Sequence, residues 1–296
     1  MTFATMPSRR SIILGVALAV GATVLGAPSA GAGTPPEGAY WHTRTLETSP
    51  HPWRFGTDSN PYSLVERHVF ERWSAPGGRA WYGGRDLGTL PRTAADRKAW
   101  RRDGSPSRWS ESIDGKTVKL STEPGRGSLT PAPREQDWFE FAGQRLTYDE
   151  VQRLPADVGR LKEWLTRAGQ VGREMDLAGW LKETLPVLLH DVPAPREVRV
   201  AAYRALLTLP GVRADGDAQD DLGRPGAAVV IDMSVKAARK APSTTVRVIV
   251  DTGRMVLLSQ SHTGTVDGKA SAEWSYEQTL IEVGWTNSRP AVPALP

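Results

Sequence analysis

Histidine supports more kinds of chemistry at neutral pH than any other side chain. This chain of 296 residues contains five histidines: His42, His51, His68, His190 and His262. A helical zinc site of the H-E-x-x-H type needs two histidines four positions apart, and no two of these have that spacing. Isolated histidines without that spacing usually pack in a core or face solvent. The sequence therefore predicts no metal site built on them.

Nucleophile and phosphate-binding motifs are equally weak. No G-x-S-x-G occurs, and Gly104-Ser105 and Gly127-Ser128 lie in segments without a strand-to-helix pattern. Gly264–Ala270 superficially resembles a phosphate-binding loop, but Ala270 follows Lys269 where Ser or Thr is needed, so we interpret it as an exposed turn. The sequence predicts no catalytic residue and no cofactor. A carboxylate pair for glycoside chemistry is recognised by its separation in space, which sequence spacing does not give.

The acidic run Asp215–Asp221 is the strongest candidate for binding a hard cation such as calcium, because it brings four carboxylates together. Its sixth position is Asp220, where a calcium loop of the EF-hand type needs glycine, and no glutamate stands at the twelfth. A surface turn that joins two strands is the better interpretation. No metal-binding residue is assigned.

The composition is that of a folded protein. Hydrophobic residues make up 39% and charged residues 24% of the chain, which is typical of a globular domain. The 11 tryptophans either pack in the core and sheet or line an apolar cavity. Cysteine is absent, which excludes disulfides, thiol catalysis, cysteine-based zinc sites and a lipid-modified cysteine.

The charge pattern gives no sign of a nucleic-acid partner. The net charge is only +4, and basic residues alternate with acidic ones along most of the chain. The one basic cluster is Arg97–Arg102, which we interpret as a solvated loop or helix face.

The N-terminus has the layout of a secretory signal peptide over residues 1–32. Arg9-Arg10 precede an uncharged apolar stretch, Ser11–Ala27, and Ala30-Gly31-Ala32 offers small residues for cleavage before a linker at 33–38. An uncleaved anchor formed by the apolar stretch is the alternative, because its length is close to that of a bilayer span. Both interpretations place the rest of the chain outside the cytoplasm, either secreted or anchored to the cytoplasmic membrane. Export by the general or by the twin-arginine route stays open.

The first third of the mature chain predicts a β-meander. Strands are predicted at 39–47, 64–73 and 79–82. The third strand is expected to end at Gly83-Gly84, and three prolines with Asp58-Ser59-Asn60 predict a loop over 49–62. Residues 91–134 predict a loop-rich insertion with one short strand at 115–120.

Three helices are predicted in the middle of the chain. The first follows a cap at Asp157. The second has an apolar stripe over 177–188, and Pro186 should stop or kink it near its end. The third starts at Pro195 and ends at Pro210-Gly211.

The last third returns to strands. They are predicted at 227–233, 246–250, 255–259 and 273–286. A turn is predicted at Asp251–Arg254, and the tail at 289–296 is expected to be flexible. Strands, then helices, then strands is an α+β order, which predicts a single domain over 39–288.

Several turn and cap segments match a known pattern. They are Leu154–Asp157, Pro195–Leu206, Leu209–Val212, Asp221–Gly226 and Val250–Arg254, together with the strands Tyr40–Leu46 and Trp73–Trp81. In these segments the chain resembles an uncharacterised actinobacterial family of exported or membrane-anchored proteins, often encoded beside extracytoplasmic-function sigma factors. That family is similar to the half-barrel of lipoprotein carriers and envelope-stress sensors. The resemblance implies a curved, half-barrel-like antiparallel sheet packed against two to three helices, with a concavity that holds acyl chains.

Three hypotheses for function follow. The first is an exported, non-enzymatic protein that binds an apolar ligand, such as a lipid, or an envelope signalling partner. It predicts a mature chain that begins near Gly33, and an apolar groove between sheet and helices without clustered titratable residues. The second is a secreted hydrolase whose histidine or carboxylate pair comes together from distant residues. The third is a structural cell-surface domain with a filled core.

Overall fold

The computed structural model describes six stretches of the chain. They are residues 36–113, 115–132, 138–169, 176–233, 243–266 and 269–295. The predicted signal peptide or anchor, residues 1–32, lies outside these stretches, as does the start of the linker. No helix within the six stretches is both long enough and apolar enough to span a bilayer.

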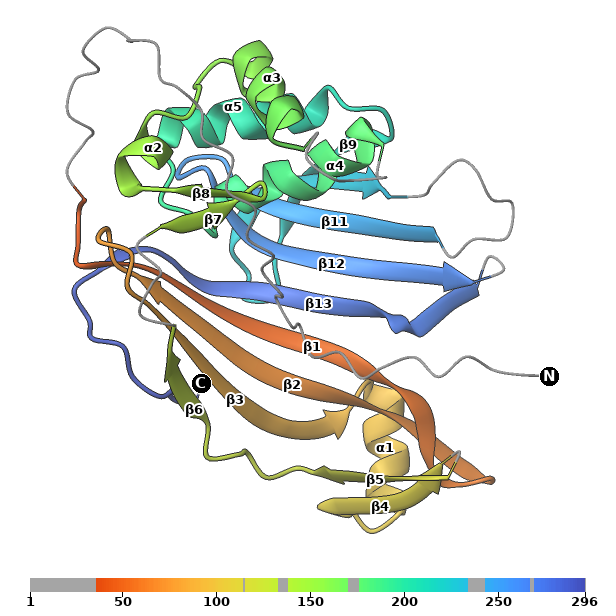
Figure 1. Cartoon of the computed structure of the whole chain (residues 1–296). Helices are drawn as coiled ribbons and strands as arrows, with labels where there is room; N and C mark the ends of the chain where they lie inside the picture. The colour runs from red at the N-terminus through yellow and green to blue at the C-terminus, as the bar shows by residue number, and fades with distance from the viewer. Residues whose placement is uncertain are drawn as a thin grey trace, which may run out of the picture. The chain divides into compact units, whose positions relative to one another are not determined.

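Within these stretches, nine antiparallel strands form one curved sheet in the order β6-β3-β2-β1-β13-β12-β11-β10-β9 (Figure 1). Its strands are β1 Tyr40–Thr57, β2 Asn60–Ser74, β3 Ala80–Pro91, β6 Ser128–Pro131, β9 Val212–Gln219, β10 Pro225–Asp232, β11 Ser243–Asp251, β12 Val256–Val266 and β13 Lys269–Thr286. β1 and β13 pair at the centre and join the N-terminal meander to the C-terminal strands. An antiparallel sheet with its helices grouped together in the sequence confirms the α+β prediction.

The loop predicted over 49–62 is wrong. β1 continues to Thr57 and β2 starts at Asn60, so that the connection shrinks to Asp58-Ser59. The β1–β2 register breaks between Pro50 and Arg54, and this irregularity accommodates prolines inside a long hairpin.

The expected end of the third strand at Gly83-Gly84 is also wrong, because β3 continues to Pro91. A Cβ at Gly83 would lie 2.9 Å from the ring of Pro293, so glycine is needed where the C-terminal segment crosses β3. The guanidinium of Arg44 donates to the carbonyl of Ala294 at 2.8 Å in the same segment. The flexibility predicted for this tail stays a prediction.

The insertion predicted over 91–134 is more regular than a loop. It contains α1 Ala94–Arg102 and a hairpin of β4 Arg108–Ile113 and β5 Lys116–Ser121, and β5 confirms the short strand predicted there. Thr93 and Asp96 form a capping box that starts α1. This local helix signal was present in the sequence, but the loop prediction followed the charged composition of the segment instead. These elements close a small second core, which contains Phe55, Tyr62, Leu64, Ala99 and Trp109.

The other helical elements pack together over the β10–β13 part of the sheet (Figure 1). They are α2 Tyr148–Gln152, α3 Val158–Gly169, α4 Leu177–Thr184, the 3-10 helix η1 Leu185–Leu189 and α5 Arg196–Leu207, with a hairpin of β7 Phe139–Phe141 and β8 Gln144–Leu146 beside them. The Asp157 carboxylate caps α3, and the α-helix gives way to a 3-10 turn at Pro186, as predicted. The short α2, β7 and β8 were not predicted.

The main core lies between these helices and the sheet. α5 contributes Ala201, Ala202, Ala205 and Leu206, all at most 2% exposed. The strands contribute a row of Val, Ile and Leu side chains from β10 to β13. This core fixes α5 against the sheet and so positions the residues that precede and begin the helix.

Candidate functional site

The β12–β13 pair is closed at one end and open at the other. Its pairing runs from Val266 and Lys269, beside the connecting turn, to Ser259 and Thr279. Beyond that point β12 stays with β11, whereas β13 stays with β1. Figure 1 shows the two strands side by side toward the right and diverging toward the left.

Two arginines hydrogen-bond to backbone carbonyls at this split. Arg224, in the turn before β10, donates from Nη2 to the carbonyls of Leu258 at 3.2 Å and Leu280 at 2.7 Å, one on each side of the split. Arg254, in the β11–β12 turn, donates to the carbonyl of Val283 at 2.9 Å. Buried carbonyls need such partners where a neighbouring strand is missing. The split is therefore a stabilised feature of the sheet.

A cavity of about 910 Å³ opens at the split, between the sheet and the helices. The sheet side is formed by β1, β12 and β13, and the helix side by α2 and the start of α5. This volume lies within the range of small-molecule sites, roughly 300–1,000 Å³. A concavity therefore lies between sheet and helices, as expected, but its lining is mostly polar instead of apolar.

One part of the cavity wall is aromatic. Trp285 of β13 packs edge-to-face against Trp41 of β1, with ring centroids 5.7 Å apart, and against Tyr148 of α2, at 5.9 Å. The indole nitrogen of Trp41 donates to the carbonyl of His190 at 2.8 Å and so fixes its ring. Trp41 and Trp285 therefore line a cavity, which is one of the two roles predicted for the tryptophans.

Another part of the wall is cationic. In the first turn of α5, the Arg196 Nε donates to the carbonyl of Gly253 at 3.1 Å and the Arg199 Nη2 to that of Arg254 at 3.3 Å. Arg199 also donates to the carbonyl of Ala194 at 2.5 Å. These acceptors are uncharged, and none of Arg196, Arg199 and Arg254 forms an ion pair with any residue in the described stretches.

The charged groups of this wall influence one another. Burial lowers the pKa of the Arg199 guanidinium below its ordinary value, and the nearby Arg196 and Arg254 lower it further. Glu197 and Glu37 raise that pKa but offset only part of the effect. The contributions of Arg196 and Arg254 to this lowering show that the three guanidinium groups lie near one another. The Nε of Arg199 is buried and lacks a hydrogen-bond partner within the described residues.

The start of α5 is an unfavourable place for these cations. The N-terminal end of a helix carries partial positive charge and favours acidic side chains, each typically by about 0.3–1 kcal/mol. α5 has one acid in its first turn, Glu197, beside Arg196 and Arg199. Arg196 and Arg199 therefore do not stabilise α5 through its dipole.

His42 forms the only titratable constellation on the cavity wall that resembles part of a catalytic site, within the described residues. Its Nε2 lies 3.0 Å from the Glu71 carboxylate and its Nδ1 lies 3.3 Å from that of Glu282. The ring is buried and stacks on Trp73 with centroids 4.6 Å apart. Nε2 hydrogen-bonds Glu71, and Nδ1 faces the exposed carboxylate of Glu282, so both ring nitrogens have a protein carboxylate beside them.

The expectation of an apolar groove is thus only partly correct. The cavity has an aromatic section, but it also gathers titratable groups, against the prediction that none would cluster there. The arginines come from three segments that the sequence suggested were turns and helix starts: Pro195–Leu206, Asp221–Gly226 and Val250–Arg254. The sequence feature that could have indicated this cluster is the presence of an arginine in each of these three segments. Only the fold shows that they converge.

The surface turn predicted over Asp215–Asp221 is only partly correct, because Asp215–Gln219 belong to β9 and Asp220, which follows in the turn to β10, is buried. Its carboxylates separate, since Asp215 pairs with Arg213 at 2.7 Å and with Arg247 at 3.1 Å, while Asp220 pairs with Arg224. Hydrogen bonds from Arg213 and Arg247 hold the pKa of Asp215 below its usual value. The described residues contain no group of three or more His, Cys, Asp or Glu that could hold a metal ion.

The other sequence motifs lie away from the cavity wall. Gly104-Ser105 follow α1, and Gly127-Ser128 lead into β6 at the edge of the sheet. Gly264 is in β12 and Lys269 in β13, and residues 267–268 between these strands lie outside the described stretches. The basic cluster Arg97–Arg102 forms most of α1 and confirms the predicted helix face.

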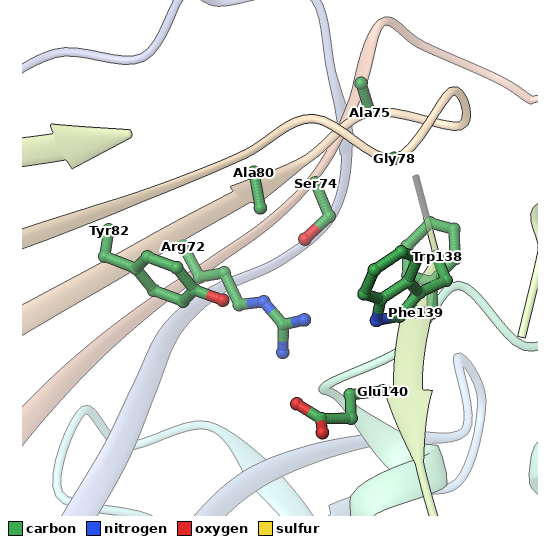
Figure 2. A pocket seen from close by; sticks show the side chains of 9 residues that line it. All are labelled: Arg72, Ser74, Ala75, Gly78, Ala80, Tyr82, Trp138, Phe139 and Glu140. Atoms are coloured by element: carbon green, nitrogen blue, oxygen red, sulfur yellow. The ribbon is translucent and has the colours of Figure 1, made fainter. Parts of the chain in front are cut away.

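A second void, shown in Figure 2, is too small for a ligand. It lies between the Arg72 side chain of β2, Tyr82 of β3 and the chain at Trp138–Glu140, and its volume is about 10 Å³, near that of one water molecule. Arg72 donates to Asp191 at 2.7 Å. Burial lowers the pKa of Arg72, but Asp191, Tyr82 and Glu140 together more than offset this, so that the pKa stands above its ordinary value. This site is an ion-paired contact between β2 and the segment after η1.

His51 and His190 make the stability of the fold sensitive to acid. Burial lowers the pKa of both rings below the ordinary value of 6.5. The unfolded chain therefore binds more protons than the folded chain as pH falls through 6.5, and the stability present above that pH is lost progressively below it. We expect the thermal midpoint to fall between pH 7 and pH 5.

The measurement is a series of thermal melts of the wild type and of the double variant His51→Asn/His190→Asn. The variant should show a shallower dependence on pH, with the difference in slope limited to about 1.4 kcal/mol per pH unit for each histidine. If stability depends equally on pH in the wild type and the variant, His51 and His190 are not the source of the acid sensitivity, whatever the two thermal midpoints are.

No protein-family model matches this sequence, and no curated protein matches it. Among solved structures, a β-barrel-like protein of the domain of unknown function DUF1849 from Brucella abortus aligns with 84% of this chain and 99% of its own. The identity is 11% and the TM-score is 0.19, a likeness too distant to carry an argument. The description of the site therefore rests on the chain itself.

Proposed function

We propose that this protein is an exported, non-enzymatic binding protein that holds a small molecule with an apolar part, such as a lipid, in the cavity between sheet and helices. The observation that carries the proposal is the cavity of about 910 Å³ at the split between β12 and β13. Its aromatic section offers Trp41, Trp285 and Tyr148 to an apolar group.

Export is supported by the charged, apolar and small-residue order of residues 1–32. A role in the cell envelope, as a carrier or a sensor with a signalling partner, is supported by the resemblance to exported actinobacterial proteins. A non-enzymatic role is supported by the environment of His42, whose two nitrogens are already engaged by carboxylates.

The test is native mass spectrometry of the protein exported by an expressing actinobacterium, followed by organic extraction. We expect a co-purifying apolar mass, and we expect Trp285→Leu to retain less of it than the wild type. Trp53→Leu is the matched control, because Trp53 lies in β1 outside the cavity wall. A mass of the protein alone would overturn the proposal in favour of a structural or partner-binding domain, and a pull-down of envelope proteins would follow.

A further inference from the structure

We infer that Arg196, Arg199 and Arg254 form an anion-binding subsite of the cavity, so that its ligand is an amphiphile with a carboxylate or phosphate head. This inference rests on the proposed function for the apolar part of the ligand. The head would lie at the arginines and the apolar part at the aromatic section.

The three guanidinium groups have donors to spare. Each arginine carries five N–H donors. Among the described residues, Arg196 uses its Nε toward Gly253, Arg199 uses its two Nη groups toward Ala194 and Arg254, and Arg254 uses one Nη toward Val283. The other N–H donors of Arg196 and Arg254, whose side chains are exposed, stay available to a ligand. Planar guanidinium groups bind carboxylates and phosphates through paired N–H donors.

The arginines also converge from two elements. Arg196 and Arg199 are three residues apart on one side of α5, and both donate to the turn that carries Arg254. Arg199 also lies over the ring of Trp41, with its guanidinium carbon 5.9 Å from the ring centroid, so the cationic and aromatic sections of the wall adjoin.

The acidic groups nearby do not neutralise the cluster. Glu37 and Glu197 are exposed and act on Arg199 only at a distance. Glu282 faces His42 at 3.3 Å. Asp251 accepts from the backbone amides of Gly253 and Arg254 and so shapes the turn. Glu37, Glu197 and Glu282 line the same cavity, but none of them forms an ion pair with the three arginines in the described structure, which leaves the guanidinium groups available to a ligand anion.

The experiment measures calorimetric affinities of the full chain for probes that share one tail and differ in the head. The probes are dodecanoate, dodecyl phosphate, dodecanol and dodecylammonium, with acetate and inorganic phosphate as heads without a tail. We expect the two anionic amphiphiles to bind roughly 10- to 100-fold more tightly than dodecanol, the size of effect typical of charge-assisted hydrogen bonds. Added salt should weaken the anionic probes and leave dodecanol unchanged.

Variants locate the subsite. Arg199→Gln should remove most of the preference for anionic heads over dodecanol. Arg196→Gln and Arg254→Gln, at more exposed side chains, give the same readout if the first variant folds poorly. Arg101→Gln on α1 is the matched control and should behave as wild type.

The outcomes separate the two claims. Equal affinity for dodecanol and the anionic amphiphiles would overturn the anion subsite and leave the apolar cavity standing. Binding of inorganic phosphate or acetate as tight as that of the corresponding amphiphile, lost in Arg199→Gln, would support the subsite and overturn an apolar ligand. If no probe binds, both claims fail.

Discussion

Replacing Arg224 with methionine is expected to lower the free energy of unfolding by about 3–5 kcal/mol, the usual cost of removing one partner of a buried ion pair. The Asp220 carboxylate is fully buried and accepts from Arg224 through Nε at 2.7 Å and Nη2 at 2.5 Å. Without the guanidinium, that carboxylate keeps only the backbone amides of Leu222 and Arg224. The carbonyls of Leu258 and Leu280 would lose the same donor.

Urea unfolding followed by tryptophan fluorescence measures this change. The control is Arg108→Met, since Arg108 and Glu123 form an ion pair at 3.0 Å with both side chains exposed, and its removal should cost less than about 1 kcal/mol. The double variant Asp220→Asn/Arg224→Met should recover part of the loss, because the unpaired buried charge is gone. Similar costs for Arg224→Met and Arg108→Met would show that the split between β12 and β13 does not depend on Arg224.

Replacing Leu206 with alanine is expected to cost about 2–5 kcal/mol of stability, because the lost methyl groups leave a cavity that a packed core fills only in part. Leu206 of α5 is 0% exposed and belongs to the core shared by the helices and the strands β10–β13. The same substitution at Leu177, which is 48% exposed at the start of α4, should change stability by no more than about 0.5 kcal/mol.

This comparison tests whether α5 and the sheet unfold together. A single cooperative transition with an unchanged denaturant slope is expected for Leu206→Ala. A loss below about 1 kcal/mol would mean that α5 is not held firmly against the sheet, and the cationic wall at its first turn would then lack a fixed position.

Local signals in the sequence determined much of the fold. The Asp157 cap, the break at Pro186 and the turn at Asp251–Arg254 all lie where their side chains predict, because each depends on residues a few positions apart. The alternating Val residues of β11 and the order of elements were enough for the α+β class.

Long-range contacts decided the points at which prediction failed. Prolines near Pro50 indicate a loop until β2 pairs across them, and Gly83 looks like a strand end until Pro293 packs against it. The charged stretch at Ala94–Arg102 becomes a helix because Ala99 joins a core with distant aromatic residues. Tertiary packing overrides local propensity in each case.

The candidate site was decided by tertiary structure alone. The sequence around Arg196, Arg199, Arg224 and Arg254 indicates only a helix start or a turn at each position. Their convergence requires that β13 leave β12 for β1, and that α5 be packed over the resulting split. The sequence by itself showed that these arginines lie at turns and at a helix start, because turns and helix starts depend on residues a few positions apart. Only the pairing of distant strands decided that these arginines share one cavity, because strand pairing joins residues that no local spacing relates.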